Sequence, residues 1–416
     1  MQKNTYKIVP FGCAMNESDA ERLKNVMNEH DFKDNDKNPF VVIFIACSVR
    51  QSAIDRVFGQ VNQIKKKNSK CKIVLTGCVL AEDKKKFEKL VDILIDIKEI
   101  EKLPQLIKGV DNTKDASSNY FHIDPNRNST ISALVPVMTG CNNFCSYCAV
   151  PYTRGREYSR PVAEILNEVE NLVKKGYKEI ILLGQNVNSY KYIGFPKLIQ
   201  KINAIKGDFW IRFFTSHPKD LSDELITAIN ECEKVGKYIH LPAQSGDNAI
   251  LKKMNRKYSV GYYIKLIKKL RKVIPDITLS TDIIVGFPGE TKKNFENSAR
   301  LFRDIEYDMA YVSQFSPRTG TKASEMKDTI EKQEKKKRDK ILTEILKKTA
   351  LKKNKKYKNT IQEILVEKKL KNGKYVGKTK NYKYITFSSK ENLIGKFIWV
   401  KITDVGAFKL EGKIVK

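Results

Sequence analysis

The stretch that decides the fold runs from Gly140 to Pro161 and is "GCNNFCSYCAVPYTRGREYSRP". It contains Cys141, Cys145 and Cys148 in a C-x3-C-x2-C spacing, and no fourth cysteine follows nearby. Thiolates bind zinc or iron–sulfur clusters, and a cubane held by four cysteines has no open coordination position. A cubane held by three cysteines leaves one iron free to bind a small molecule. The spacing therefore predicts a cluster with an open iron; the alternative is a zinc site completed by one of the four histidines.

The composition is that of a folded protein. The chain has 416 residues, of which 41% are hydrophobic, enough for two or three domains. Its start lacks a basic region followed by an uninterrupted apolar segment, so we expect no signal peptide. The longest apolar run, Phe40–Val49, is about half the length that spans a bilayer. We therefore expect a cytoplasmic protein without membrane contact, whose eight cysteines serve metal binding or catalysis instead of disulfides.

The net charge points to a polyanionic partner. It is +30 at pH 7, and such an excess of basic residues is typical of proteins that bind nucleic acid. Lysine far outnumbers arginine, so a lysine-rich composition of the whole proteome is an alternative explanation.

Strands and helices alternate in the first third of the chain. The β-branched runs "YKIVPFG", "FVVIFIA" and "KIVLTG" are each followed by a charged amphipathic segment, which predicts a doubly wound parallel sheet. Cys13, Cys47 and Cys78 stand at the ends of these three runs. Because ligands gather at the carboxyl ends of parallel strands, we expect these cysteines to lie together. Cys71 starts its strand and Cys232 falls in a predicted helix, so we expect both to be ordinary buried thiols.

The rest of the chain shows two further architectures. A polar, aperiodic segment at 111–130 is typical of a linker, and six strand–helix units follow it, which predicts an open partial barrel. The cysteine triplet comes directly after the first of these strands, where active-site residues belong. A basic helix at 330–358 precedes five short β-rich runs, which predict a small barrel over 360–416. The basic run 335–338 is interpreted as a solvated helix face.

Polar side chains stand at several of the predicted strand ends. Gln185 and Asn186 end the second strand and Gln244 ends the fourth, where they either bind a ligand or satisfy backbone groups in a turn. Ser245 is open to the same two interpretations. Three arginines follow the cysteine triplet and either bind an anion or lie on the surface, namely Arg154, Arg156 and Arg160. Two histidines are expected to be structural, namely His217 and His240.

The motifs resemble a known family. The cysteine spacing, with Tyr147 before the last cysteine, resembles the radical S-adenosylmethionine (SAM) enzymes. Over essentially the whole chain, further motifs are similar to MiaB-type tRNA methylthiotransferases. These motifs are "FGCAMNESDAERL", "ACSVR", "TGCV", "LLGQNVNSY", "RFFTSHP", "HLPAQSG", "MNRKYS", "STDIIVGFPGET" and "FSPRTGTKAS".

This resemblance implies an α/β protein with three domains. They are an N-terminal methylthiotransferase domain at 1–118, a radical SAM core with a partial (β/α)6 barrel at 127–358, and a TRAM β-barrel at 359–416. It also implies SAM and two 4Fe-4S clusters, one held by Cys141, Cys145 and Cys148 and one by Cys13, Cys47 and Cys78. Further cofactor-binding residues would be Tyr147, Gln185 and Gln244. We expect a monomer whose partner is tRNA.

The implied reaction replaces the hydrogen on carbon 2 of N6-isopentenyladenosine, at position 37 of tRNA, by a methylthio group. No catalytic residues are implied beyond the cluster ligands. Some positions depart from the family's pattern, namely Ala14, Ala46, Thr319 and Lys322. None of them removes a ligand, but the last two leave the loop geometry near Thr319 in doubt. Removing residues 360–416 is expected to weaken tRNA binding and to leave SAM cleavage intact.

Three alternatives remain at this point. Related enzymes methylthiolate threonylcarbamoyl-adenosine in tRNA (MtaB type) or an aspartate of a ribosomal protein (RimO type). The chain could also be an RNA-binding protein whose clusters are structural, although a structural cluster gains nothing from an open iron. "CSVR", "GQNVNSY" and "TSHP" match the MiaB type better than either relative. The sequence identifies neither the substrate tRNAs nor the sulfur and electron donors.

Overall fold

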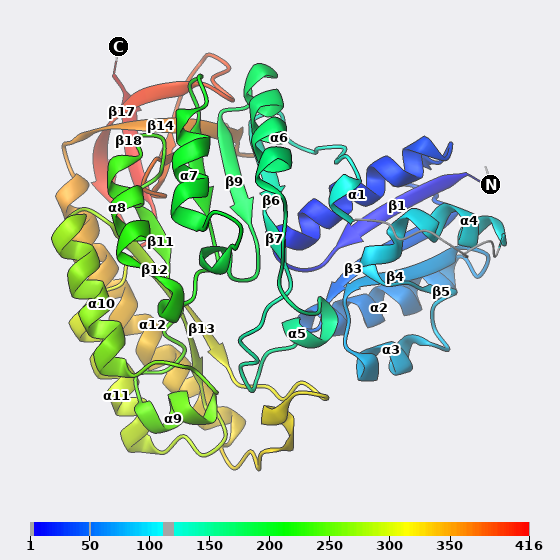
Figure 1. Cartoon of the computed structure of the whole chain (residues 1–416), viewed down its shortest axis with the longest axis horizontal. Coiled ribbons are helices and arrows are strands. Elements are labelled where there is room, and N and C mark those ends of the chain that lie inside the picture. The colour runs from blue at the N-terminus through cyan, green and yellow to red at the C-terminus, as the bar shows by residue number, and fades with distance from the viewer. Residues whose placement is uncertain (1–3, 50, 111–119, 416) are drawn as a thin grey trace. The chain divides into compact units, whose positions relative to one another are not determined.

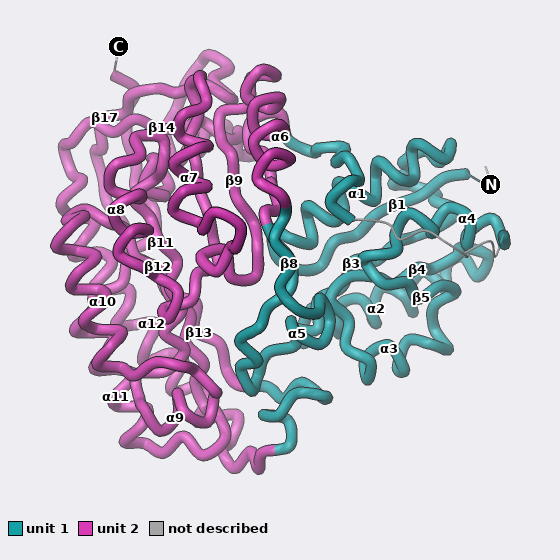
Figure 2. The backbone as a smooth tube through the Cα atoms, viewed as in Figure 1, with its two compact units in different colours: residues 1–129, 138–160, 316–325 teal, residues 130–137, 161–315, 326–416 magenta. Residues whose placement is uncertain are grey.

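The computed structural model describes residues 4–49, 51–110 and 120–415. The chain forms two compact units, each assembled from separate segments (Figure 2). Unit 1 contains residues 1–129, 138–160 and 316–325, and unit 2 contains residues 130–137, 161–315 and 326–416. The boundaries expected at 118/127 and 358/359 stay predictions, because neither unit is one continuous stretch of sequence.

Unit 1 is built on a parallel sheet in the order β2-β1-β3-β4-β5, which confirms the doubly wound prediction (Figure 1). Its strands are β1 (Thr5–Pro10), β2 (Lys33–Asp34), β3 (Val41–Cys47), β4 (Lys72–Cys78) and β5 (Ile93–Leu94). Its helices are α1 (Ala14–Glu29), α2 (Gln51–Lys67), α3 (Ala81–Phe87) and α4 (Leu103–Lys108), with 3-10 turns η1 (Ile97–Lys102) and η2 (Tyr120–His122).

Strand β3 shows why its sequence is apolar throughout. Val41, Ile43 and Ile45 belong to the core that also contains residues of α1, whereas Val42 and Phe44 belong to the core that contains residues of α2. Successive side chains of a strand point to opposite faces, and both faces of this sheet are covered. A strand covered on both sides cannot alternate apolar and polar residues.

The linker prediction for 111–130 is only partly testable and is wrong for its second half. Residues 111–119 lie outside the described residues. Tyr120, Phe121 and Ile123 are buried in the same core as α1, and the backbone N–H groups of Asn126 and Asn128 donate to Glu21. This segment packs against α1, so its polar composition reflects bonds to a buried polar helix and not a spacer.

Residues 138–160 of unit 1 form a loop whose two ends are joined by a pair of short strands. Strands β7 (Met138–Thr139) and β8 (Tyr158–Ser159) pair antiparallel and bracket the cysteine triplet. Within the loop lies the short helix α5 (Val150–Thr153). The turn η5 (Lys322–Glu325) is tied to the same loop, because the N–H of Ala323 donates to the carbonyl of Ser146.

Unit 2 contains the predicted six-strand series as two parallel sheets, β10-β9-β6 and β11-β12-β13. A bridge between Ile211 and Val235 connects β10 to the segment before β11. The strands are β6 (Ser132–Pro136), β9 (Glu179–Leu183), β10 (Trp210–Phe213), β11 (Tyr238–His240), β12 (Thr278–Val285) and β13 (Met309–Gln314). The helices are α6 (Val162–Lys174), α7 (Phe195–Ala204), α8 (Asp223–Glu231), α9 (Asn248–Lys253), α10 (Val260–Val273), α11 (Lys292–Ile305) and α12 (Lys332–Asn354), with 3-10 turns η3 (Val187–Ser189), η4 (Pro218–Asp220) and η6 (Lys355–Tyr357).

The C-terminal segment forms the predicted small barrel, closed in the order β14-β15-β16-β18-β17. Its strands are β14 (Ile361–Lys369), β15 (Tyr375–Thr379), β16 (Tyr384–Phe387), β17 (Phe397–Val405) and β18 (Leu410–Ile414). Closure removes free strand edges, and the apolar side chains of the barrel fill their own core.

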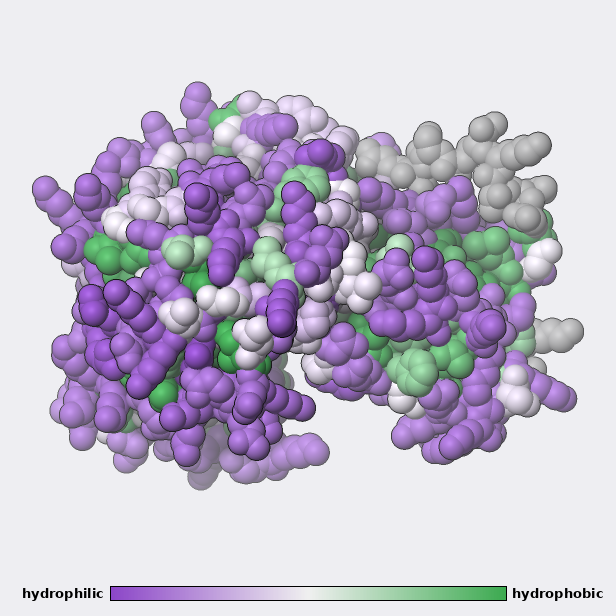
Figure 3. Space-filling model, turned by 90° about the horizontal axis from the view of Figure 1, so that it is seen from below, coloured by the Kyte–Doolittle hydropathy of each residue, from purple (hydrophilic) through white to green (hydrophobic). Residues whose placement is uncertain are grey.

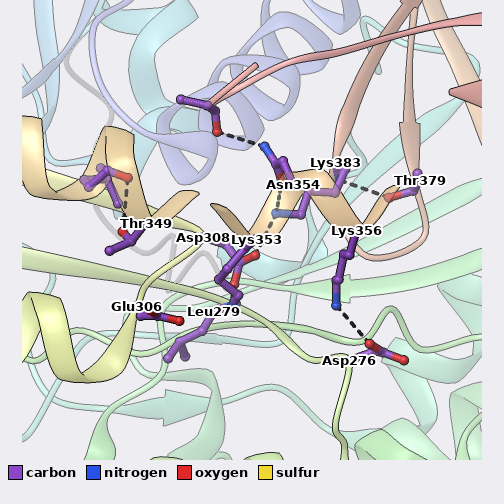
Figure 4. Close-up of polar contacts among 12 residues, drawn as sticks. Asp276, Leu279, Glu306, Asp308, Thr349, Lys353, Asn354, Lys356, Thr379 and Lys383 are labelled. Carbon is purple, nitrogen blue, oxygen red and sulfur yellow. Dashed lines mark hydrogen bonds and ion pairs between the residues drawn. The ribbon is translucent and has the colours of Figure 1, made fainter. Parts of the chain in front are cut away.

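Buried ionic contacts fasten this barrel to the rest of unit 2. Asp308 accepts hydrogen bonds from Lys383 of the barrel at 2.7 Å, from Lys353 of α12 at 2.5 Å and from the N–H of Leu279 at 3.0 Å (Figure 4). Burial alone raises the pKa of Asp308, but the two ammonium groups hold it below its ordinary value. Lys383 also donates to Asn354 at 2.9 Å.

A second contact repeats this pattern at the same turn of the barrel. Arg212 of β10 pairs with Glu179 of β9 and donates to the carbonyls of Thr379 and Lys380 at 2.8 and 2.7 Å. Both members of the ion pair are buried. A truncation of residues 360–416 would therefore leave Asp308 without Lys383 and two donors of Arg212 without their acceptors, so the predicted survival of SAM cleavage in that variant stays a prediction.

The interpretation of 335–338 as a solvated face is also wrong for two of its residues. Lys335 is buried, donates to Asp328 at 2.5 Å and packs on Gly286. Arg338 is buried and pairs with Glu290 at 2.6 Å. Residues 336 and 337 are exposed as expected. Net charge did not show that these two cations have carboxylate partners from other elements.

We predict that Asp308→Ala destabilises unit 2 by about 3–5 kcal/mol, since it leaves the buried ammonium group of Lys383 and the half-buried one of Lys353 without their carboxylate. Lys269→Ala is the matched control, because Lys269 pairs with Asp223 on an exposed surface and should cost about 0–1 kcal/mol. Urea unfolding of the two variants measures both values. A cost for Asp308→Ala that equals the control would show that this contact does not hold the barrel.

Candidate metal centre

The first group of three cysteines lies at the carboxyl edge of the unit 1 sheet. Cys47 and Cys78 are the last residues of β3 and β4 and are paired in register. Cys13 does not end a strand as expected; β1 ends at Pro10, and Cys13 is the N-cap of α1. Thiols at a helix N-terminus face its positive dipole end, which favours negative charge there. The strand order places this edge at the switch between β1 and β3.

Asn16 connects two of these thiols and was not predicted as a site residue. Its Oδ1 lies 3.7 Å from the sulfur of Cys13 and 3.9 Å from that of Cys78. Its amide nitrogen donates to the carbonyl of Ala46 at 3.0 Å. Burial raises the pKa of Cys78 to about 12, Arg154 opposes this, and Cys47 and Cys13 are near enough to raise it further. Cys13 and Cys78 thus lie beside the same amide group, and Cys47 is paired with Cys78.

Gly77, inside β4, permits the close approach of β3 and β4 next to Cys78. Its φ of +101° is in the region that favours glycine, and a Cβ there would lie 2.5 Å from the carbonyl oxygen of Ala46 on the neighbouring strand. The backbone conformation and the close approach of β3 therefore both require the glycine of the "TGC" sequence.

The second group is held by the loop between β7 and β8. The N–H of Cys148 donates to the carbonyl of Cys145 at 3.0 Å, and the N–H of Cys141 donates to the carbonyl of Gly155 at 3.1 Å. Cys141 and Cys145 are buried and Cys148 is half-buried. Burial raises the pKa of Cys141, and the backbone and side chain of Asn143 oppose it. Tyr147 is half-buried beside Cys148.

One guanidinium group contacts the first cysteine group. Arg154 is 2% exposed, and its Nε donates to the sulfur of Cys78 at 2.9 Å. Arg318 donates to the carbonyl of Val49, two residues after Cys47, at 3.2 Å; burial lowers the pKa of Arg318, and Asp83 and then Cys47 oppose this. The contact of Arg154 favours negative charge on Cys78.

The other two arginines of the loop differ from each other. Arg156 is exposed and its guanidinium lies 4.3 Å from the ring centre of Phe144. Arg160 is buried, with its guanidinium 5.9 Å from the ring centre of Phe121. The surface interpretation therefore holds for Arg156 alone among the three arginines and is wrong for Arg154 and Arg160.

A cavity of about 300 Å³ opens beside this loop in unit 1. Its lining includes the rings of Tyr120, Phe121 and Tyr158, together with Arg156 and other cationic side chains. The rings of Phe121 and Tyr158 are stacked at 5.7 Å. This cavity combines flat apolar surfaces with positive charge.

The remaining predicted residues lie in unit 2, at the carboxyl ends of its strands. The Oε1 of Gln185, the Oδ1 of Asn186 and the Oγ of Ser216 are buried and find no hydrogen-bond partner among the described residues. Their loops adjoin, because the N–H of Val187 donates to the carbonyl of Thr215. Buried polar atoms are normally satisfied, so acceptors and a hydroxyl left over at a strand edge fit a polar ligand.

Gln244 and its neighbour are also buried in unit 2. Gln244 has a φ of +66°, a conformation that costs a residue with a side chain energy and that clusters at functional sites. Its N–H donates to the carbonyl of Asp282 at 2.9 Å. Ser245 is 1% exposed, and its Oγ accepts from the N–H of Asp247 at 3.2 Å, which is a turn role.

The two histidines have structural contacts, as expected. The Nδ1 of His217 accepts the N–H of Lys219 at 3.2 Å, and burial, with Arg256 nearby, lowers its pKa to about 2. His240 contacts Ser280 at 2.8 Å and Asp282 at 3.2 Å.

Neither cysteine group is arranged to bind a single metal ion. Within the described residues, no three His, Cys, Asp or Glu side chains are placed to hold one metal ion. A cubane distributes its cysteine ligands over different irons, so the test is the chemistry of the donors. Two thiols paired in register, a third at a helix N-terminus and the guanidinium group of Arg154 fit an anionic iron–sulfur cluster.

Comparison with family models agrees with the three architectures. Residues 135–302 match the Radical SAM superfamily, residues 5–96 match "Uncharacterized protein family UPF0004", and residues 355–415 match the TRAM domain. Within the described residues, no helix is both long and apolar enough to cross a bilayer.

Relatives of full length decide the family. The chain is 41% identical over 443 aligned positions to the tRNA-2-methylthio-N(6)-dimethylallyladenosine synthase of Clostridium perfringens (strain SM101 / Type A), covering 100% of this chain and 99% of the relative. The chain belongs to the tRNA-2-methylthio-N(6)-dimethylallyladenosine synthase family. Members from Clostridium botulinum (strain Okra / Type B1) and Thermoanaerobacter pseudethanolicus are also 41% identical, over 98% and 99% of this chain and 96% and 93% of theirs. The resemblance inferred from the motifs is confirmed.

Solved structures support the fold of this synthase family member. The radical SAM methyltransferase TsrM from Kitasatospora setae matches with a TM-score of 0.56 at 12% identity, covering 77% of each chain. The radical SAM enzyme OxsB matches with a TM-score of 0.51 at 14% identity, over 84% of this chain and 56% of its own. Membership of the radical SAM superfamily implies SAM and a 4Fe-4S cluster as cofactors.

We predict that Gly140→Ala disrupts the loop of the second cysteine group. Gly140 has a φ of +77°, and a Cβ there would lie 2.0 Å from the carbonyl oxygen of Arg156. Gly176→Ala is the matched control, because Gly176 has a φ of +87° but no described atom lies within 4 Å of its Cβ position. The control should cost roughly 1–2 kcal/mol from backbone strain alone, and Gly140→Ala clearly more. Urea unfolding of the apoproteins compares them; equal costs would contradict the close packing of this loop.

Proposed function

We propose that this protein transfers a methylthio group to carbon 2 of N6-isopentenyladenosine at position 37 of tRNA. The observation that carries the proposal is 41% identity over the whole chain to synthases named for this product. Two cysteine groups in one compact unit support it, since sulfur insertion needs more than a radical source. We assign the work to three domains, at 1–118, 127–358 and 359–416.

We propose that Cys141, Cys145 and Cys148 hold the cluster that binds SAM, and that the group formed by Cys13, Cys47 and Cys78 holds a second 4Fe-4S cluster. When bound, SAM and the cluster on Cys141, Cys145 and Cys148 would supply the radical, SAM would supply the methyl group, and the second cluster would hold the sulfur that is transferred. The chain's own part is to present three thiolates in each group and to leave one iron position open. No side chain of ordinary pKa removes the hydrogen from an aromatic C–H, so we assign no further catalytic residues.

The SAM contacts come from the strand ends of unit 2. Gln185 offers a buried oxygen without a described partner, which suits the ammonium group of SAM. Gln244, held at a positive φ, is assigned to the ribose. We assign Tyr147 to the same site as a side-chain neighbour of SAM.

The partner is tRNA, and the proposed contact surface is the basic outer surface. The formal net charge is +30, and hydrophilic side chains predominate on the face drawn in Figure 3. Lysine and arginine that contact phosphates release counterions, so tRNA affinity should fall steeply with salt. We propose a monomer that acts in the cytoplasm without membrane contact. The sulfur and electron donors are not identified.

The two clusters can be separated by mutation. Reconstituted protein should contain about eight irons per chain, and the alanine variants of either group should contain about four. Loss of Cys13, Cys47 and Cys78 should leave SAM cleavage to 5′-deoxyadenosine but no methylthio product, and loss of the other group should abolish both. Cys71→Ala and Cys232→Ala are the controls and should keep both clusters, as buried thiols outside the two groups. Colourless, zinc-loaded wild-type protein would refute the proposal.

Substrate choice distinguishes this function from its nearest alternative. A threonylcarbamoyl group carries a carboxylate, whose burial without a cation costs several kcal/mol, whereas an isopentenyl group is apolar. We expect turnover of tRNA with N6-isopentenyladenosine and none of unmodified or threonylcarbamoyl tRNA, measured by nucleoside mass spectrometry. The cavity beside Arg156 contains cationic side chains, so it does not match the apolar pocket expected for the isopentenyl group. Equal turnover of the threonylcarbamoyl substrate would assign the chain to the MtaB type.

A further inference from the structure

Helix α1 buries polar side chains that its role as a sheet-covering helix does not explain. Asn16, Ser18, Asp19 and Arg22 are each at most 1% exposed. A helix that merely covers a sheet buries an apolar stripe, and polar groups are buried only with partners. The partners of Asp19 come from segments more than a hundred residues away in sequence: Oδ1 accepts from the hydroxyl of Tyr120, and Oδ2 pairs with Arg154.

Arg154 makes two contacts with one guanidinium group. Its terminal nitrogen lies 2.5 Å from the Oδ2 of Asp19, and its Nε lies 2.9 Å from the sulfur of Cys78. A guanidinium group keeps its charge at any ordinary pH, so the positive charge at this thiol is permanent. Its planar group fixes two acceptors at once, which an ammonium group does not reproduce.

Arg154 belongs to the loop of the other cysteine group. It follows Cys148 by six positions and is the C-cap of α5. The next residue, Gly155, accepts the N–H of Cys141 at 3.1 Å. One short segment thus makes a backbone hydrogen bond to Cys141, in the group proposed to hold the SAM cluster. It also makes a side-chain hydrogen bond to Cys78, in the group proposed to hold the second cluster.

We propose that Arg154 is a positioning residue that donates a charge-assisted hydrogen bond to Cys78, a ligand of the second cluster, and thereby raises that cluster's reduction potential. This inference rests on the proposed function, in which Cys78 is a ligand. Reduction adds negative charge to a cluster, and a hydrogen bond or a positive charge at a ligand sulfur stabilises the reduced form. Asp19 orients the guanidinium and partly offsets its charge. The segment that folds around the SAM cluster therefore also adjusts the electronic state of the other cluster.

The test uses two variants of the full-length, reconstituted protein whose effects have opposite signs. Asp19→Asn removes a negative charge and leaves Arg154 in place, so the midpoint potential of the second cluster should become more positive than in the wild type. Asp19→Asn combined with Arg154→Met removes the donor without leaving a buried carboxylate unpaired. Its midpoint should be more negative than that of Asp19→Asn and of the wild type. Redox titration followed by electron paramagnetic resonance measures these values, with Cys141, Cys145 and Cys148 changed to Ala so that one cluster is titrated.

Arg156→Met is the matched control. Arg156 lies two positions further along the same loop, and its described contact is with the ring of Phe144, not with Cys78. The control should leave the midpoint of the second cluster unchanged. A general loosening of the loop would move all variants in one direction, which separates it from the electrostatic effect.

The outcomes are distinguishable from failure of the proposed function. If the parent protein binds no cluster at Cys13, Cys47 and Cys78, iron analysis shows it, and the proposed function fails before this inference is tested. If about four irons are bound and the two variants shift the midpoint in opposite directions, the inference is supported. A midpoint that is the same in the double variant and the wild type, at full iron content, would overturn it.

Discussion

The arrangement depends on one geometric constraint: parallel strands in a sheet present their carboxyl ends at a common edge. In unit 1 this brings together thiols at positions 13, 47 and 78, although the chain between them contains two complete helices. The register pair of Cys47 and Cys78 follows directly from hydrogen bonding between β3 and β4, without any side-chain contact. Side chains assembled in this way are positioned by the backbone of regular strands, which is more rigid than a loop. The same constraint operates in unit 2, where Gln185 and Ser216 follow adjacent strands.

The sequence predicted those features that depend on period and spacing. The apolar runs identified β3, β9 and β12, and the five β-rich runs at the C-terminus identified a closed barrel. The position of Cys47 followed from its strand. Cys13 was assigned to the end of β1, since sequence alone does not show that the strand stops at Pro10 and that the thiol caps a helix instead.

The features that escaped prediction are those in which a charged side chain has a partner far along the chain. Arg154 was expected to bind an anion or to lie on the surface, and Lys335 was expected to be solvated. Both are buried, because Asp19 and Asp328 neutralise them. Composition and local periodicity contain no information on such pairs. The linker prediction failed for the segment after residue 119 for the same reason. This segment is polar because it forms hydrogen bonds with the buried polar face of α1.

The attachment of the C-terminal barrel has a consequence for chimeric proteins. Asp308 and Arg212 bind the barrel through one turn, Thr379 to Lys383, and through its backbone carbonyls as much as its side chains. An RNA-binding barrel from another protein would have to reproduce that turn in conformation, including the positive φ of Tyr382, to satisfy the same buried donors. Exchange of this module between enzymes should therefore be limited by the residues at this turn. Strands of the barrel away from the turn would be free to diverge while the turn remained fixed.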